Sequence, residues 1–241
     1  MSNEFWNANW QPRRGISNPK LPLFLDGQKT TKLAEAECRK ITDFLVLEKE
    51  IHAFTEDQNR DSWLQKNKQV QSNYEYVSKG VSDVQQKFKQ MDQQNREKIL
   101  DPYVKRLRIQ NEFVHMLHDQ DAEQNIQVPS LFKAASSWWP EGAYLYKHCG
   151  FGGYWIYLPL NSTIPHLSFL GLNDAISSVI LVRHSTPFSC SLYEHGWYQG
   201  RRVTIVAGSP GTTTQVRCLK GYPYYFNDKA SSVIVSNWWS G

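Results

Sequence analysis

Asn227-Asp228-Lys229-Ala230-Ser231-Ser232 has an earlier copy in this chain, Asn173-Asp174-Ala175-Ile176-Ser177-Ser178. Each copy consists of two Asn or Asp positions, two variable positions and two serines, and a β-branched apolar run follows each copy. Oxygen-bearing side chains packed this closely suit a hard cation such as Ca²⁺, which takes about six to eight oxygen ligands. The alternative is a pair of Asx or Ser turns that only satisfy backbone groups. The recurrence of the stretch favours the ion site.

A second motif lies upstream of each copy. Residues 146–153 read Tyr-Lys-His-Cys-Gly-Phe-Gly-Gly, and residues 193–200 read Tyr-Glu-His-Gly-Trp-Tyr-Gln-Gly. Both have a Tyr, four residues, an aromatic residue, one further residue and a Gly. A folded-over β-hairpin explains the pattern, because Gly adopts the positive φ that such a turn needs and the two aromatic rings can clamp it. The sequence therefore predicts two hairpins, each followed by one Asn/Asp-Ser stretch.

The alternation of two such hairpins with two Asn/Asp-Ser stretches resembles the βγ-crystallin superfamily, in particular its microbial calcium-binding members. The resemblance covers about residues 141–239 and implies an all-β sandwich of two four-stranded Greek keys. Period-two hydrophobic patterns at residues 154–158 and 203–206 agree with strands in this region. The expected fold class of the whole chain is therefore α+β and multidomain, with the sandwich as its C-terminal part.

The resemblance also implies which residues would bind calcium, at about two ions per chain. In each stretch the family uses the Asn/Asp pair, the backbone carbonyl of the third position and the hydroxyl of the fifth, and a carbonyl just after the hairpin Tyr often completes the shell. Which stretch partners which is left open, and the ammonium of Lys229 would weaken its site if it pointed inward. The implied ligands are Lys147, Asn173, Asp174, Ala175, Ser177, Glu194, Asn227, Asp228, Lys229 and Ser231.

An elongated helical bundle or coiled coil is expected upstream of the sandwich. Apolar residues give residues 31–55 a broad helical face. Between Val70 and Met91, apolar residues follow each other at alternating steps of four and three, a seam typical of helices packed side by side. The broad face of the first helix favours a bundle folded back on itself, and an intermolecular coiled coil is the alternative.

The chain of 241 residues is predicted to divide into four segments. Within the helical segment, Asp101 followed by a proline ends or kinks the long helix and suits the start of a third one. The segments are an irregular arm rich in aromatic residues and proline over 1–29, the helical bundle or coiled coil over 30–121, a linker over 122–140, and the βγ-crystallin-like domain over 141–241.

The net charge and the tryptophans of the chain indicate which kinds of partner to expect. The net charge of +4 is too small and too evenly spread to indicate a nucleic-acid partner. The expected partner is a second copy of the chain or another protein, bound through the helical region. Trp138-Trp139 and Trp238-Trp239 bracket the β domain, and packing is their expected role. Contact with a membrane or a carbohydrate remains the alternative for these residues.

The expected compartment follows from the N-terminus and the cysteines. Residues 1–6 show no basic start or apolar core of a secretory signal, and no run of 18 apolar residues occurs. A cytoplasmic location is the default expectation, with secretion by a signal-independent route left open. The four cysteines are not spaced as metal-binding pairs, and free thiols are favoured over the single disulfide that the C-terminal half could form. They are Cys38, Cys149, Cys190 and Cys218.

No catalytic residues are expected, because the sequence shows no nucleophile elbow, phosphate-binding loop or metalloprotease helix. Two functions remain. The first is a non-enzymatic calcium-binding protein whose helices mediate self-association or docking of a partner. The second is a membrane-active toxin or defence protein, in which the crystallin-like domain would serve as a targeting or stabilising module.

Overall fold

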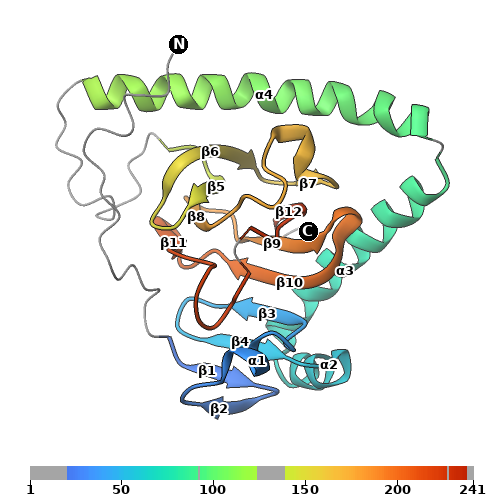
Figure 1. Cartoon of the computed structure of the whole chain (residues 1–241), viewed down its shortest axis with the longest axis vertical. Helices are drawn as coiled ribbons and strands as arrows, with labels where there is room; N and C mark the ends of the chain where they lie inside the picture. Colours follow the sequence, from blue (N-terminus) through green and yellow to red (C-terminus); the bar gives the residue numbers. More distant parts are fainter. Residues whose placement is uncertain (1–20, 92, 124–138, 227, 238–241) are drawn as a thin grey trace.

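The computed structural model describes residues 21–91, 93–123, 139–226 and 228–237, and most of the predicted N-terminal arm and linker lies outside these ranges. Two β-sheets pack together, with helices along their sides (Figure 1). The strands of the C-terminal half are β5 (Gly142–His148), β6 (Gly152–Pro159), β7 (Ser162–Ile164), β8 (Ser178–Arg183), β9 (Phe188–His195), β10 (Gln199–Val206), β11 (Thr212–Val216) and β12 (Ser232–Asn237), with short 3-10 turns η1 (Leu167–Leu170) and η2 (Gly196–Tyr198).

The C-terminal half consists of two Greek keys that exchange their third strands. Strands β5 to β8 belong to the first repeat and β9 to β12 to the second. The smaller sheet has the order β11-β8-β5-β6, and the larger sheet contains the run β10-β9-β12-β7. Each sheet thus holds three strands of one repeat and the third strand of the other. The predicted double Greek-key sandwich is confirmed.

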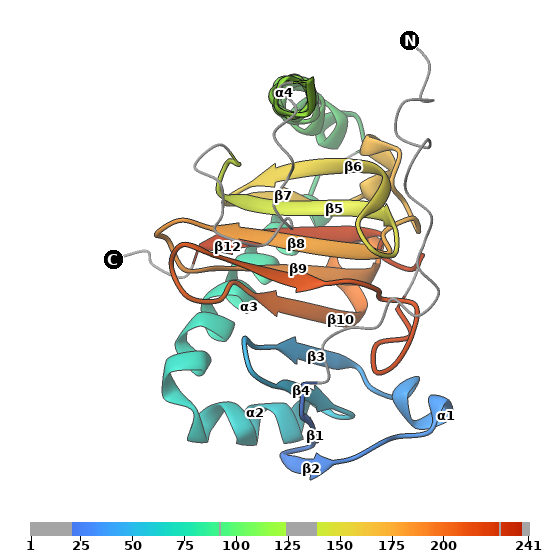
Figure 2. The same ribbon diagram turned by 90° about the vertical axis from the view of Figure 1, so that its left-hand side faces the viewer.

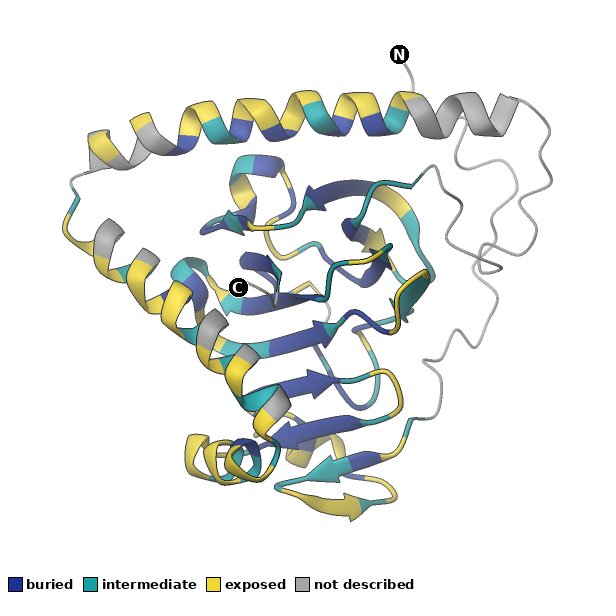
Figure 3. Ribbon diagram, turned by 180° about the vertical axis from the view of Figure 1, so that it is seen from behind, coloured by how far each residue is buried: buried dark blue, intermediate teal, exposed yellow. Residues whose placement is uncertain are grey.

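The core of the sandwich includes the apolar residues that follow the two Asn/Asp-Ser stretches. Val179 and Leu181 of β8 face Leu192 of β9 and Val233 of β12 within one cluster, and all four side chains are fully buried. Figure 3 shows the central strands buried along most of their length. Trp139 packs against the ring of Tyr144, whereas Trp138 and Trp238-Trp239 lie outside the described residues.

The N-terminal part of the chain does not begin with the predicted helix. Residues 23–54 form four strands and one short helix, and these strands extend the larger sheet to eight strands, in the order β2-β1-β4-β3-β10-β9-β12-β7 (Figure 2). Strand β3 pairs in parallel with β10, in a register that places Phe44 beside Val203. The elements are β1 (Leu23–Leu25), β2 (Gln28–Thr30), α1 (Glu35–Cys38), β3 (Asp43–Val46) and β4 (Ile51–Phe54).

Burial on both faces explains why the helix prediction over residues 31–55 was wrong. All four residues of β3 and all four of β4 are buried. A strand buried on both faces loses the alternation of polar and apolar residues that identifies a strand in a sequence. The resulting apolar runs mimic the broad face of a helix.

The predicted helical bundle over residues 30–121 does not form in the described part of the chain. Helix α3 packs on the larger sheet, where Val81 contacts Tyr193, Tyr198 and Ile234, and α4 crosses one end of the sandwich (Figures 1 and 2). The heptad spacing was real, but a helix facing a sheet shows a similar period. The helices are α2 (Asp57–Lys66), α3 (Lys68–Lys89) and α4 (Gln93–Glu123), and α4 continues through the proline predicted to start a third helix.

A buried ionic cluster holds the N-terminal strands and helices to the sandwich. The Asp43 carboxylate of β3 pairs with the guanidinium of Arg202 on β10, and the Nε–Oδ1 distance is 3.1 Å. It also accepts a hydrogen bond of 2.5 Å from Tyr74 of α3 and lies 3.8 Å from Arg60 of α2. Three elements of the N-terminal part therefore meet one strand of the second repeat.

Helix α4 hydrogen-bonds to the edge strands of both sheets. The buried Asn111 amide accepts a bond of 2.6 Å from the N–H of Tyr157 on β6 and donates one of 2.9 Å to its carbonyl. The hydroxyl of Tyr103 accepts a bond of 3.2 Å from the N–H of Thr163 on β7. These bonds satisfy backbone groups that an edge strand would otherwise leave unpaired. None of the helices in the described ranges is long and apolar enough to span a membrane.

Candidate metal centre

Both predicted hairpins fold over, and both are clamped by the predicted pair of rings. Tyr146 and Phe151 pack edge to face with ring centroids 5.6 Å apart, and Tyr193 and Tyr198 do the same at 5.7 Å. A Tyr followed five positions later by an aromatic residue therefore forms the same edge-to-face ring pair in both repeats.

The glycines of the hairpins are required by space as well as by backbone conformation. Gly153 and Gly200 have φ of +74° and +78°. A Cβ atom at Gly153 would lie 2.5 Å from the ring of His148, and one at Gly200 would lie 2.7 Å from the ring of His195. Any other residue would both strain the backbone and displace the histidine.

The last serine of each stretch locks its own hairpin. The Ser178 hydroxyl donates a 2.6 Å hydrogen bond to the carbonyl of His148 and accepts a 3.1 Å bond from the N–H of Phe151. Ser232 does the same in the second repeat, with bonds of 2.6 Å to His195 and 3.0 Å from Tyr198. This role was not predicted, although the recurrence of a serine at the sixth position was its signal.

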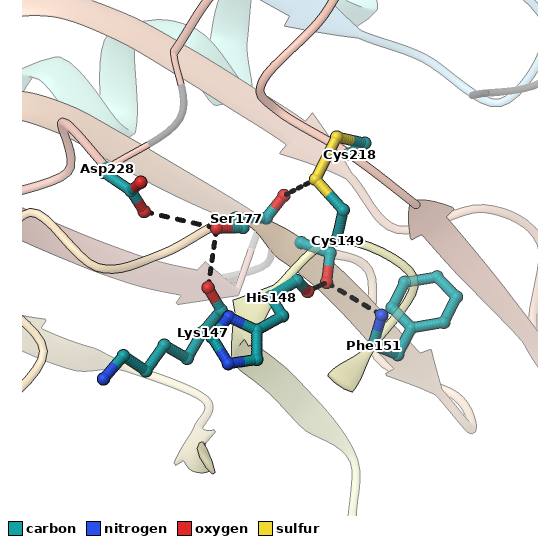
Figure 4. The surroundings of a disulfide bond; sticks show 8 residues. Lys147, His148, Cys149, Phe151, Ser177, Cys218 and Asp228 are labelled. Carbon is teal, nitrogen blue, oxygen red and sulfur yellow. Dashed lines mark hydrogen bonds between the residues drawn. A yellow bond between two sulfur atoms is a disulfide. The ribbon is translucent and has the colours of Figure 1, made fainter. Parts of the chain in front are cut away.

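The fifth-position serine of the first stretch lies at the centre of a cluster of oxygen atoms, called site A here. The hydroxyl of Ser177 is 2.6 Å from the carbonyl oxygen of Lys147 and 3.3 Å from Oδ1 of Asp228 (Figure 4). The backbone N–H of Ser177 also donates to the carbonyl of Tyr146, which fixes the stretch against its hairpin.

The equivalent cluster of the second stretch is called site B. The hydroxyl of Ser231 donates a 2.9 Å hydrogen bond to Oδ1 of Asp174, and its backbone N–H donates to the carbonyl of Tyr193. Asp174 is held on its other side by the amide of Asn173, at 2.7 Å from Oδ2. Site B thus repeats the serine–aspartate contact of site A and its backbone bond to the hairpin tyrosine.

The two stretches exchange their carboxylates, and this answers the question of partnership that the sequence left open. Site A takes its hydroxyl from the first stretch and its carboxylate from the second, and site B does the reverse. The backbones follow the same pattern, because the N–H of Asp174 donates to the carbonyl of Ala230 and that of Asp228 donates to Ile176. Each cluster therefore exists only when both repeats are folded together.

The distances in these clusters suit a calcium ion. Two ligand oxygens that each lie about 2.4 Å from one Ca²⁺ are roughly 2.8 to 3.4 Å apart at the angles of its coordination shell. The serine–aspartate distances of 3.3 Å in site A and 2.9 Å in site B fall in this range. The 2.6 Å between the Ser177 hydroxyl and the Lys147 carbonyl is shorter, and a bound ion would replace this hydrogen bond. Carbonyl, hydroxyl and carboxylate oxygens are also the ligands that Ca²⁺ prefers. In the described ranges, no three His, Cys, Asp or Glu side chains gather as a metal cluster.

Four of the predicted ligands that the structure describes take no direct part in these contacts: Asn173, Ala175, Glu194 and Lys229. Asn173 is exposed and supports Asp174, and Asn227 lies outside the described residues. Ala175 and Lys229 occupy the third positions, next to the carboxylates, so that only their carbonyl oxygens suit a cation. The side chain of Lys229 is instead engaged by Glu194.

Solved βγ-crystallin domains are similar to part of this chain. A domain from Flavobacterium johnsoniae is 26% identical, with a TM-score of 0.31, and the match covers 40% of this chain and 96% of that one. A domain from Clostridium beijerinckii is 21% identical (TM-score 0.29; 40% and 98% covered), and one from Ciona intestinalis is 19% identical (TM-score 0.30; 38% and 95% covered). No protein-family model matches the chain, and no curated protein sequence is significantly similar to it.

The C-terminal part of this chain is similar to these solved domains, and we call it the βγ-crystallin-like domain.

An ion pair in the βγ-crystallin-like domain joins the segments that supply the two sites. The ammonium of Lys229 lies 3.0 Å from Oε1 of Glu194, the residue that follows the hairpin tyrosine. Burial would raise the pKa of Glu194, but the hydrogen bond and positive charge of Lys229, together with the charge and backbone N–H of Arg201, outweigh it, so that this pKa lies below its ordinary value. The repeat-related positions are Lys147 and Ala175, and alanine has no charge with which to form such a pair.

A disulfide borders site A, which corrects the prediction of free thiols. Cys149, in the first hairpin of the βγ-crystallin-like domain, is bonded to Cys218 between β11 and β12 (Figure 4). The Sγ of Cys149 lies 3.9 Å from the carbonyl oxygen of Ser177, and the N–H of Leu219 donates a 2.8 Å bond to that same carbonyl. Cys38 and Cys190 are free thiols and are buried.

Proposed function

We propose that this protein is a non-enzymatic calcium-binding protein that takes up two Ca²⁺ ions, one at site A and one at site B. The observation that supports this most directly is the exchange of carboxylates between the two stretches. A turn that only satisfied its own backbone would not need a carboxylate from the other repeat. The exchange brings an anionic oxygen to a cluster of neutral oxygens, which is the composition that binds a hard cation.

Calcium would act as a cross-link between the repeats. Its ligands in each site come from both Greek keys, so an ion bound there stabilises the folded sandwich and not the unfolded chain. A ligand that binds only the native state contributes about 2.7 kcal/mol at one hundred times its dissociation constant. Calcium therefore raises the melting temperature of the βγ-crystallin-like domain.

A charged pair joins the segments that supply the two sites. Lys229 follows the site A carboxylate Asp228, and its ammonium pairs with Glu194, which follows the hairpin tyrosine of site B. Site A has the backbone carbonyl of Lys147 within its cluster, and the side chain of that residue is exposed.

Calorimetric titration of the chelator-treated protein with Ca²⁺ tests the proposal. The expected result is two bound ions, with a calcium-dependent rise in melting temperature. The matched control is the double variant Ser177→Ala, Ser231→Ala, which keeps both hairpin-locking serines and loses both central hydroxyls. Absence of heat and of any melting shift with the unmodified chain would refute calcium binding.

The helices are proposed to provide a docking surface for a second copy or another protein. Three exposed large apolar side chains on α4 also make a membrane-active protein a second candidate function; they are Ile109, Phe113 and Met116. Dye release from liposomes, measured with and without calcium, separates the two. Leakage supports the membrane-active function, whereas intact liposomes together with stable complexes in solution support docking of a protein.

A further inference from the structure

A disulfide ties two of the three chain segments that form site A. Cys149 lies two positions after Lys147, whose carbonyl oxygen belongs to the site. Its partner Cys218 lies ten positions before Asp228, whose carboxylate belongs to the site. The third segment supplies the hydroxyl of Ser177. The bond therefore links the carbonyl side of the cluster to the carboxylate side (Figure 4).

The disulfide also lies among the hydrogen bonds that hold these segments together. The N–H of Gly150 donates a 2.6 Å bond to the carbonyl of Arg217, and each cysteine is next in sequence to one partner of this bond. The N–H of Leu219 donates a 2.8 Å bond to the carbonyl of Ser177, which lies 3.9 Å from Sγ of Cys149. Movement of the two sulfur atoms therefore acts on the backbone of the serine at the centre of site A.

Site B has the same backbone bonds, with a glycine and a histidine in place of the two cysteines. These residues are Gly196 and His166. They pack closely, since a Cβ atom at Gly196 would lie 2.1 Å from the imidazole ring of His166. The chain thus holds one covalently tied site and one matched site without the tie. The repeated backbone bonds run from the N–H of Trp197 to the carbonyl of Pro165, at 2.9 Å, and from the N–H of Leu167 to the carbonyl of Ser231, at 2.8 Å.

We propose that the Cys149–Cys218 disulfide is a redox switch that sets the calcium affinity of site A and leaves that of site B unchanged. The proposal rests on the proposed function and adds its regulation. A dithiol reductant breaks the S–S bond by thiol–disulfide exchange. It supplies two electrons and two protons, so that both cysteines become thiols while the reductant closes its own disulfide. A disulfide oxidant reverses the exchange.

The oxidised and reduced forms differ in how much order calcium binding must impose. In the oxidised form the bond fixes the spacing of the two cysteines, with their Cα atoms 4.6 Å apart. In the reduced form this tie is lost, and the segments that supply Lys147 and Asp228 gain freedom that a bound ion must remove. A ligand shifts an equilibrium only when it binds the two forms with different affinity. The oxidised form is therefore the one that binds calcium more tightly at site A.

Redox reagents can reach this bond more easily than the free thiols. Cys149 and Cys218 are half-buried, whereas Cys38 and Cys190 are fully buried. Coupling between two binding events is reciprocal. Calcium at site A should therefore lower the equilibrium constant for reduction of the disulfide by the same factor by which reduction lowers calcium affinity.

Two single-site variants test the switch. Ser231→Ala leaves site A as the intact site, and Ser177→Ala leaves site B. Each variant is titrated calorimetrically with Ca²⁺, first oxidised and then in excess dithiothreitol. Reduction of Ser231→Ala should lower calcium affinity by about fivefold or more, a typical coupling between two sites. Reduction of Ser177→Ala should change the affinity by less than about twofold, because site B has no such tie.

Removal of both cysteines is the control for the reductant. In the Ser231→Ala background, the double change Cys149→Ala, Cys218→Ala should give the calcium affinity of the reduced chain, and dithiothreitol should then have no effect. A second measurement needs no cysteine variant. The fraction of reduced disulfide in a dithiothreitol redox buffer, read by thiol alkylation and mass spectrometry, should fall when calcium is added.

Three outcomes would overturn the proposal. The first is equal calcium affinity of oxidised and reduced Ser231→Ala. The second is an equal loss at both sites on reduction, since the bond would then support the whole sandwich and not site A. The third is a redox equilibrium that bound calcium does not shift. Absence of calcium heat from the unmodified chain in both redox states would instead refute the proposed function, and the switch with it.

Discussion

The hydroxyl of Ser177 lies 3.3 Å from Oδ1 of Asp228, although 51 positions separate the two residues. Ser177 belongs to the first Greek key and Asp228 to the second. Their contact, and the reciprocal one between Ser231 and Asp174, make each oxygen cluster a property of the folded pair of repeats. This relationship leads to a prediction for calcium binding at site A.

Ser177→Ala should remove one calcium ion and leave the other. The change deletes the central hydroxyl of site A but keeps the hairpin lock made by Ser178. We expect the stoichiometry to fall from about two ions to one, or affinity at one site to fall by about tenfold or more. Calorimetric titration measures both. Ser185→Ala, at an exposed bend, is the control. An equal loss of calcium affinity at both sites would contradict the prediction that the two sites bind calcium independently.

The pair between Glu194 and Lys229 predicts a dependence of stability on acidity. The pKa of Glu194 in the folded protein lies below its ordinary value of 4.5. Its ionised form therefore stabilises the fold at pH values above 4.5, and this contribution is lost as the pH falls through the lower folded pKa. Lys229→Gln should reduce the free energy of unfolding at pH 7 by about 1 kcal/mol or less, because the pair is partly exposed.

Urea unfolding in chelator at neutral pH and near pH 3 checks this prediction. The difference between the unmodified chain and Lys229→Gln should be present at neutral pH and should disappear in acid. A difference that grew on acidification would show that Lys229 does not stabilise the ionised carboxylate. Lys220→Gln, an exposed lysine between β11 and β12, serves as the control.

The disulfide predicts a thiol count and an effect on calcium. Unfolded protein should show two reactive thiols without a reductant, from Cys38 and Cys190, and four after treatment with a dithiol. The native protein should react slowly, because burial raises the pKa of both free thiols. Reduction should weaken site A more than site B, since the bond tethers the hairpin that supplies the Lys147 carbonyl. Four thiols without reductant would contradict the pairing.

Asn111 should be a key residue for attachment of α4. Replacement by Ala removes both bonds to Tyr157 and leaves two buried backbone groups unpaired, at a cost of about 1 to 3 kcal/mol for each group. Asn111→Asp should also destabilise the protein, because a carboxylate cannot donate to the Tyr157 carbonyl. Chemical denaturation measures both, with Gln110→Ala as the control. Equal stability of Asn111→Ala and Gln110→Ala would refute the role.

The two hairpins and the sandwich could be predicted from the sequence because their determinants are local and repeated. The pairing of Tyr146 with Phe151 depends on residues within one turn. Tyr193 and Tyr198 pair in the same way in the second repeat. The exchange of Asp174 and Asp228 between sites could not be predicted, because it depends on how the two repeats pack. A single sequence indicates which residue types could bind the ion, but not which serine and which carboxylate share a site.

The N-terminal strands were missed for a different reason. Asp43-Phe44-Leu45-Val46 is buried on both faces, and its hydrogen-bonding partner β10 lies far along the chain. Nothing in the spacing of these four residues distinguishes a buried strand from part of a buried helix. The carboxylate of Asp43 was the remaining signal, since a charge within an apolar run needs a buried partner. Its partner, Arg202, is visible only in the folded structure.

The parallel pairing of β3 with β10 has a consequence for synthesis of the protein on the ribosome. Asp43 leaves the exit tunnel well before Arg202, from which 159 positions separate it. At about 5 to 20 residues per second, this interval lasts roughly 8 to 30 s. During that time the nascent N-terminal strands have no docking edge, so their apolar residues need protection by a chaperone or by one another until the last hundred residues have been translated.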